Sequence, residues 1–230
     1  MLKKETLDLL GKNRDFKSIF SICIGRSWLY QIRFKDYLGK YGRWDTSVKE
    51  GVLKLDDRTF SVEYIGTTSD SDNYWCSAEM EKVIPDDYID MMMNTRKTME
   101  SLSIPDLTEK KICMDEEVNA FNLSMIYLAF APQNVTYFCG KGYTSIHMFV
   151  KNVPNEIFRT MEPKEFVTRV PEILSEFDVD HRLMIQGLLS ENDIEYQMDE
   201  KSIVAKFREN ATITIKFNEN NFITNISGDL

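Results

Sequence analysis

The chain has 230 residues, of which 43% are apolar, 12% aromatic and 28% charged, and its formal net charge is −9. This composition excludes a fibrous or intrinsically disordered chain, and a chain of this length buries a core without disulfides or a structural metal. The negative charge argues against nucleic acid and anionic lipid as main partners. The charge is uneven: residues 1–60 carry 13 Lys and Arg against 8 Asp and Glu, and residues 61–230 carry 15 against 29.

The first residues and the cysteines bear on the compartment. The N-terminal ten residues lack the apolar run of a secretion signal. The longest unbroken apolar stretch, residues 125–131, is far shorter than the roughly 20 residues that span a bilayer. Widely separated cysteines predict buried, reduced thiols rather than a disulfide framework; they are Cys23, Cys76, Cys113 and Cys139. We therefore expect a soluble, cytoplasmic protein that has no membrane partner.

The N-terminal region predicts one helix followed by a strand meander. Apolar residues spaced three or four apart predict a helix over residues 16–38, which ends at Gly39. The hydrophobic period then changes to two, which is typical of strands. The expected strands are centred on residues 46–48, 52–55, 60–64 and 74–78, with a polar loop over residues 66–73.

The middle of the chain predicts two helices and a hairpin. Pro85 opens the first helix, which is expected to stop before Pro105. Acidic residues 115–117 suit the positive end of the second helix, which runs to Pro132. Two strands, residues 135–138 and 144–150, then flank a glycine-containing turn that permits a tight reversal.

The C-terminal third repeats the order of helix and meander. Pro171 suits the first turn of a helix, and an apolar stripe continues from it to Ser190. Alternating apolar residues then predict an antiparallel sheet that is buried on one face. Its four strands are expected at residues 194–198, 203–207, 211–217 and 222–226.

These patterns predict an α+β fold of antiparallel meanders with helices packed on them, in which a helix-plus-meander unit occurs twice. Residues 1–152 would form an N-terminal α+β unit, and residues 163–230 a C-terminal helix with a four-stranded meander. Residues 151–165, which contain two prolines, are the candidate linker. Two related halves and one bilobed domain both fit this organisation.

Two motifs in the hairpin region suggest chemistry. The segment Gly140–Ser145 resembles the end of a phosphate-binding loop, but position 135 is valine where that loop needs glycine, so a plain turn is favoured. Cys139 and His147 lie eight residues apart across the hairpin, and a thiolate with an imidazole base is one arrangement that they could form. The alternative is two packed strand residues.

Two further groups of residues suggest a metal site and a nucleic-acid surface. Asp178, Asp180 and His181 could hold a divalent cation, but on one helix they point in different directions, and His181 follows the apolar stripe, which favours a core histidine. Basic and aromatic residues alternate between residues 26 and 44, as on a platform for single-stranded nucleic acid. The acidic remainder of the chain favours a solvated basic helix face instead, so we expect no nucleic-acid partner.

A family resemblance rests on residues 66–78. Gly66-Thr67-Thr68-Ser69 followed by Asn73-Tyr74-Trp75-Cys76-Ser77-Ala78 resembles an uncharacterised bacterial domain family, in which a G-T-x-S segment precedes a W-L-W-A-W-A-N strand. Ile84-Pro85, the segment Ser103–Thr108 and the hairpin Tyr137–Val150 follow in the family's order, so the resemblance covers residues 15–152. This chain has one tryptophan where the family has three, so a pocket lined by those rings would differ here. The resemblance implies a compact domain and no catalytic residue.

Two functional hypotheses remain. The first is a non-enzymatic binding protein that neutralises a basic protein partner such as a toxin domain, because residues 61–230 are strongly acidic and show no catalytic constellation. Its candidate ligand-binding residues are Trp75, Tyr143 and His147, with no cofactor and no metal. The second is a hydrolase or small-ligand enzyme that uses Cys139 with His147, or the group Asp178, Asp180 and His181. The sequence leaves the oligomeric state open.

Overall fold

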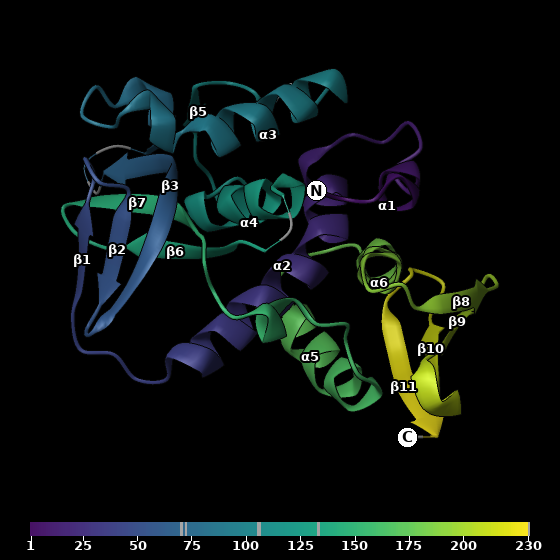
Figure 1. Cartoon of the computed structure of the whole chain (residues 1–230). Coiled ribbons are helices and arrows are strands. Elements are labelled where there is room, and N and C mark those ends of the chain that lie inside the picture. The colour runs from purple at the N-terminus through teal and green to yellow at the C-terminus, as the bar shows by residue number, and fades with distance from the viewer. Residues whose placement is uncertain (70, 72, 105–106, 133, 230) are drawn as a thin grey trace. The chain divides into compact units, whose positions relative to one another are not determined.

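The computed structural model describes residues 1–69, 71, 73–104, 107–132 and 134–229 (Figure 1). The chain divides into two compact units. Unit 1 comprises Met1 and Tyr30–Phe158, and unit 2 comprises Leu2–Leu29 and Arg159–Leu230. Tertiary packing thus groups the N-terminal residues with the C-terminal part of the chain. Independent folding of residues 1–152 and of residues 163–230 stays a prediction.

Helix α2 (Phe16–Leu38) has the bounds that the sequence predicted. The Asp15 carboxylate accepts a hydrogen bond from the backbone N–H of Ser18 at 2.7 Å, and so satisfies one of the free donors in the first turn. At the other end, Gly39 has a φ of +64°, and its N–H donates to the carbonyl of Lys35. Glycine adopts this left-handed conformation without steric cost, which explains why the helix ends there.

Unit 1 contains a sheet in which each described strand pair is antiparallel. Its long central strand, β3, pairs through its first residues with β2, through its last residues with β4, and along residues 62–69 with β7. The strands are β1 (Trp44–Ser47), β2 (Val52–Leu55), β3 (Arg58–Ser69), β4 (Tyr74–Ser77), β5 (Lys111–Cys113), β6 (Thr136–Gly140) and β7 (Thr144–Val150).

Strand β3 corrects one sequence prediction. Residues 66–69 were expected in a loop, but they continue the strand, because β4 and β7 provide backbone partners on both sides. Asp70 and Asp72, in the remainder of that expected loop, lie outside the described residues. A register shift against β7 between Tyr64 and Gly66 marks a bulge. Tyr64 therefore shares a face with Met148, whereas Gly66 shares the opposite face with His147.

The helices of unit 1 begin later than the sequence predicted. Pro85 precedes a short 3-10 turn, Asp86–Tyr88, and α3 (Asp90–Ser101) follows; Pro105, the predicted stop, lies outside the described residues. Helix α4 is Ala120–Phe130, and Asn119 caps it by accepting from the N–H of Asn122. The expected start at residues 115–117 is wrong, because the Asp115 carboxylate accepts from two following N–H groups and forms a turn instead.

Unit 2 contains the predicted four-stranded antiparallel meander, in the order β11-β10-β9-β8 (Figure 1). Ile203, Ala205, Ile213 and Ile215 are fully buried on one face, as their alternation predicted. Phe166, on the first of the two helices before the meander, contacts Phe207 in an edge-to-face pair at 5.6 Å. The elements are α1 (Lys4–Asp8), α5 (Pro163–Glu176), α6 (His181–Glu191), β8 (Glu195–Met198), β9 (Ser202–Lys206), β10 (Thr212–Phe217) and β11 (Ile223–Asp229).

The single helix expected over residues 171–190 is two helices. Helix α5 begins at Pro163 rather than Pro171, because buried Phe166 and Val170 extend the apolar stripe towards the N-terminus. Pro171 lies inside α5, where packing of this stripe outweighs the hydrogen bond that proline cannot make. Asp180 then caps α6: its carboxylate accepts from Leu183 N–H, and its own N–H donates to Ser21 Oγ.

Gly187 allows α6 to approach α2 closely within unit 2. A Cβ atom at this position would lie 2.6 Å from the carbonyl oxygen of Ile22 and 2.9 Å from its Cα. We expect Gly187→Ala to lower the free energy of unfolding by about 1 to 3 kcal/mol, because backbone must shift, although alanine favours helix. Urea unfolding checks this. Gly142→Ala, whose Cβ would meet only an atom at 3.5 Å, should change stability by less than about 0.5 kcal/mol.

The structure confirms the α+β class, and it does not confirm the repeat. Strands β5 to β7 extend the sheet of unit 1, whereas unit 2 has a plain meander preceded by two helices. All four cysteines are free, but only Cys23 is buried; Cys113 is exposed because it alternates with buried Ile112 along β5 and so lies on the other face of the strand. Among the described residues, no helix is both long enough and apolar enough to cross a bilayer.

Candidate functional site

A buried polar network surrounds His147 in unit 1. His147 on β7 lies opposite Cys139 on β6, so that the two side chains share a face of the sheet. Ser124 of α4 approaches the same imidazole, and its hydroxyl also donates to the carbonyl of Ala120 at 2.7 Å. Ser124 is fully buried and His147 is 3% exposed. The network therefore lies in the interior between α4 and the sheet.

Both imidazole nitrogens of His147 have partners. The Tyr137 hydroxyl lies 2.8 Å from Nδ1, and the Ser124 hydroxyl lies 3.2 Å from the same atom. The Thr68 hydroxyl lies 3.4 Å from Nε2. A neutral imidazole with its proton on Nε2 satisfies this geometry, because Tyr137 then donates to Nδ1 and Nε2 donates to Thr68.

Burial keeps the groups of this network uncharged. It lowers the pKa of His147 from 6.5 to about 4, raises the pKa of the Cys139 thiol above its ordinary 9.0, and raises the pKa of Tyr137 well above 10.0. A charged imidazole is disfavoured because the interior does not solvate it. At neutral pH the residues thus form hydrogen bonds between neutral groups.

The Cys139 and His147 pair that the sequence suggested is brought together, but its protonation opposes nucleophilic chemistry. A catalytic thiolate needs a lowered cysteine pKa beside an imidazolium. Here burial raises the pKa of Cys139 and lowers the pKa of His147, so both the thiolate and the imidazolium are disfavoured. The third group, which the sequence did not suggest, is Tyr137, a β6 residue whose hydroxyl contacts His147 and whose ring stacks on it at 6.0 Å. The geometry favours two packed strand residues within a polar network.

The second candidate group, in unit 2, has structural roles. Asp178 forms an exposed ion pair with Lys17 at 2.7 Å. Asp180 caps α6, and His181 Nδ1 accepts from the N–H of Ile223 at 3.2 Å. A cleft of about 230 Å³ borders Asp180, His181 and Phe222. Within the described part of the chain, no cluster of three or more His, Cys, Asp or Glu side chains is arranged to hold a metal ion.

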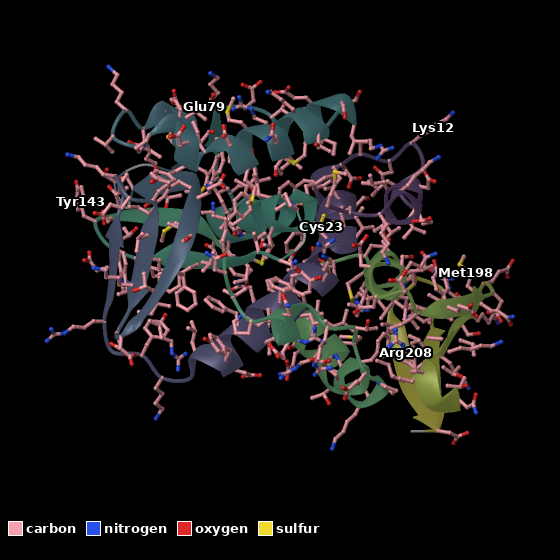
Figure 2. All side chains as sticks on the ribbon, viewed as in Figure 1. Lys12, Cys23, Glu79, Tyr143, Met198 and Arg208 are labelled. Atoms are coloured by element: carbon pink, nitrogen blue, oxygen red, sulfur yellow. The ribbon has the colours of Figure 1, made fainter. Side chains whose placement is uncertain are left out.

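The three predicted ligand-binding residues do not meet at one surface. Trp75 is fully buried, with its ring against Gly66 and 5.5 Å from the ring of Tyr127. Its indole Nε1 has no hydrogen-bond partner among the described residues. His147 is buried on the same sheet face, whereas Tyr143 is 79% exposed in the β6–β7 turn (Figure 2). A ligand-binding role for these residues stays a prediction.

An exposed surface of unit 1 was not singled out from the sequence. It is formed by residues 78–90, which we call the 78–90 segment. Val83 is 71% exposed and Met80 is 45% exposed on it. The segment also carries three exposed carboxylates, Asp86, Asp87 and Asp90. Its exposed cation is Lys82. The sequence signal of this surface is the combination of apolar and acidic side chains within one short segment. The net charge of residues 61–230 does not locate it.

The 78–90 segment is firmly held. Glu79, labelled in Figure 2, accepts a hydrogen bond from Arg96 of α3, and both side chains are nearly buried. The Glu81 carboxylate accepts from the Thr67 hydroxyl at 2.7 Å. Ile84 and Ile89 are buried at 8% and 7% exposure. These anchors present the exposed side chains on a defined backbone, which lowers the entropy cost of binding.

Comparison with known protein families gives one match. Residues 17–153 match the model of a family described as a family of unknown function, DUF6882. The chain belongs to this family. Membership in DUF6882 confirms the resemblance drawn from the sequence, and the matched region contains α2, the sheet of unit 1 and the His147 network. No curated protein and no solved structure matches the chain.

Proposed function

We propose that the chain is a cytoplasmic, non-enzymatic binding protein whose 78–90 segment binds a basic protein partner. The observation that carries this proposal is the exposure of Val83 and Met80 beside three carboxylates on an anchored segment. Exposed apolar side chains supply affinity when a partner covers them, at about 1.5 to 3 kcal/mol for each fully buried side chain. The four free cysteines suit a reducing compartment.

Charge supports a basic partner over an acidic one. Asp86, Asp87 and Asp90 are exposed, and residues 61–230 carry 29 acidic against 15 basic side chains. Complementary charge accelerates association and excludes partners of like charge. A toxin domain rich in lysine and arginine is one partner of this chemistry. Hydrolysis through Cys139 and His147 receives less support, because burial holds both groups in their neutral forms.

Capture experiments with the full chain test this proposal. The immobilised protein is incubated with extract of its source organism at low and moderate salt, and retained proteins are identified by mass spectrometry. We expect a basic protein whose retention falls at least about tenfold for the variant Met80→Ser/Val83→Ser, because both exposed apolar contacts are lost. Asp86→Asn/Asp87→Asn should weaken retention mainly at low salt, since screening already reduces the charge contribution at higher salt.

Matched variants on the same unit serve as controls. Tyr41→Ser removes an aromatic side chain that is 45% exposed, as Met80 is, and Glu116→Gln/Glu117→Gln removes two exposed charges, both outside the 78–90 segment. These controls should retain the partner at the wild-type level. Equal retention by the wild type and by Met80→Ser/Val83→Ser, with unchanged circular dichroism, would exclude the segment as the binding surface.

A further inference from the structure

The β8 strand of unit 2 is an open edge. Among the described strands, β8 pairs with β9 and with no other strand. At the hairpin, the N–H of Asp199 donates to the carbonyl of Ser202, so Asp199 and Ser202 form a hydrogen-bonded pair of the ladder. Because such pairs alternate along an antiparallel ladder, the backbone groups of Tyr196 and Met198 point away from β9. Each therefore offers one donor and one acceptor at the edge.

A groove of about 740 Å³ borders this edge. One wall is strand β8 with Lys206 of β9, and the other comes from residues that surround α1 and the end of α6. Met198 is 54% exposed at the hairpin end of β8 and is labelled in Figure 2. Tyr196 lines the groove. The edge thus joins unpaired backbone groups to apolar side chains, as strand-binding grooves do.

Carboxylates outnumber cations around this edge by a small margin, because Arg182 also lies here and donates to the carbonyls of Asp199 and Glu200. Glu195 is the first residue of β8, and Asp199 directly follows the strand, where its carboxylate accepts from the N–H groups of Lys201 and Ser202. Asp199 stays an anion, since backbone N–H groups of Lys201 and Ser202 lower its pKa. Lys3 is already paired with Asp193 at 2.6 Å, and Lys206 lies directly across from Glu195. Glu5 adds another carboxylate to the groove.

These charges argue against a second copy of the chain that pairs in the register centred on Gln197. If two β8 edges paired symmetrically about Gln197, Glu195 of one copy would lie opposite Asp199 of the other, twice. Like charges directly opposite each other destabilise a strand pair. A strand with cations at both of these positions avoids this repulsion and gains two favourable pairs.

We infer that the β8 edge binds an extended segment of a partner protein as a fifth, antiparallel strand, with the pattern basic–apolar–any–apolar–basic. The two basic side chains face Asp199 and Glu195, and the two apolar ones face Met198 and Tyr196. Backbone hydrogen bonds to Met198 and Tyr196 supply register, and the charges supply selectivity. This surface belongs to unit 2 and is independent of the 78–90 segment of unit 1.

The probe is a fluorescent peptide, Lys-Val-Thr-Val-Lys, added to the full chain at low salt and followed by anisotropy. In the inferred register both valines exchange hydrogen bonds with β8, while the threonine N–H points away from it. N-methylation of both valines should therefore abolish binding, and N-methylation of the threonine should leave it unchanged. Exchanging both lysines for glutamate should also abolish binding. Glu195→Lys in the protein should weaken binding about twofold to fivefold.

Hydrogen exchange places the peptide on the edge. The amides of Tyr196 and Met198 should gain protection when peptide binds, whereas those of Gln197 and of Ile226 on the opposite edge strand should not change. Ser227→Lys on β11 is the matched control for Glu195→Lys and should bind as the wild type does. Absence of binding, equal binding of the two N-methylated peptides, or no protection at Tyr196 and Met198 would overturn the inference. So would a dimer of the free chain that protects these amides.

Discussion

Arg26→Met should destabilise unit 2 by about 3 to 5 kcal/mol, because it leaves a buried carboxylate without its cation. The side chain of Glu191 is 1% exposed and that of Arg26 is 5% exposed, with 2.7 Å between Nη1 and Oε2. Glu191 also accepts from the N–H of Lys3 at 2.8 Å and from the Thr6 hydroxyl at 2.6 Å. The carboxylate thus connects α2, α6 and the segment that contains α1.

Urea unfolding followed by circular dichroism measures this effect. The double variant Arg26→Met/Glu191→Met should recover most of the loss, since it removes the uncompensated charge together with its partner. Lys17→Met breaks the exposed pair with Asp178, in which the side chains are 43% and 87% exposed, and should cost less than about 1 kcal/mol. A loss of similar size for Lys17→Met and Arg26→Met would contradict the assigned role of burial.

His147 should make unit 1 less stable as the pH falls below about 6.5. Its pKa is 6.5 when exposed to water and about 4 in the fold, so between these values the unfolded chain binds more protons than the folded one. The contribution of His147 to the free energy of unfolding is therefore fully present above pH 6.5 and is lost progressively towards pH 4. The difference between these two pKa values corresponds to about 3 kcal/mol.

Unfolding in urea at several pH values between 7.5 and 4.5 measures this dependence. His147→Gln keeps hydrogen-bonding groups beside Tyr137 and Thr68 but cannot titrate, so its stability should change less with pH than that of the wild type. His181→Gln is the matched control, because His181 is only partly buried and its nearby carboxylates oppose the lowering of its pKa. Identical pH profiles for the wild type and His147→Gln would show that another group is responsible.

The two proposed interaction surfaces can be tested separately. Met80→Ser/Val83→Ser acts on unit 1, and Glu195→Lys acts on unit 2. If a single basic partner used both surfaces, each variant alone would weaken its retention, and the two effects together would exceed either one. The peptide assay reports on the β8 edge alone, so loss of the proposed function of the 78–90 segment would leave its outcome unchanged.

Local sequence determined the elements that contain their own start and stop signals. Helix α2 has its predicted bounds because its apolar period is long and because Asp15 and Gly39 cap its ends. Strands β8 to β11 follow from strict alternation between polar turns. The same local reasoning failed at Pro171 and Asp115, where the burial of Phe166 and Val170, and capping by Asn119, set the helix starts. Packing thus set the start of α5, whereas a second local signal, the Asn119 cap, set the start of α4.

Only the tertiary structure decided which distant residues meet. The pairing of β3 with β7 joins residues about 80 positions apart and turns an expected loop into strand. That pairing brings His147 to Thr68, while α4 brings Ser124, so that the sequence could name His147 but not its partners. The link between Glu191 and residues 3 and 6 is equally invisible along the chain. Spacing in the sequence determines faces of single elements, whereas burial, and with it every pKa shift in the interior, depends on which faces pack together.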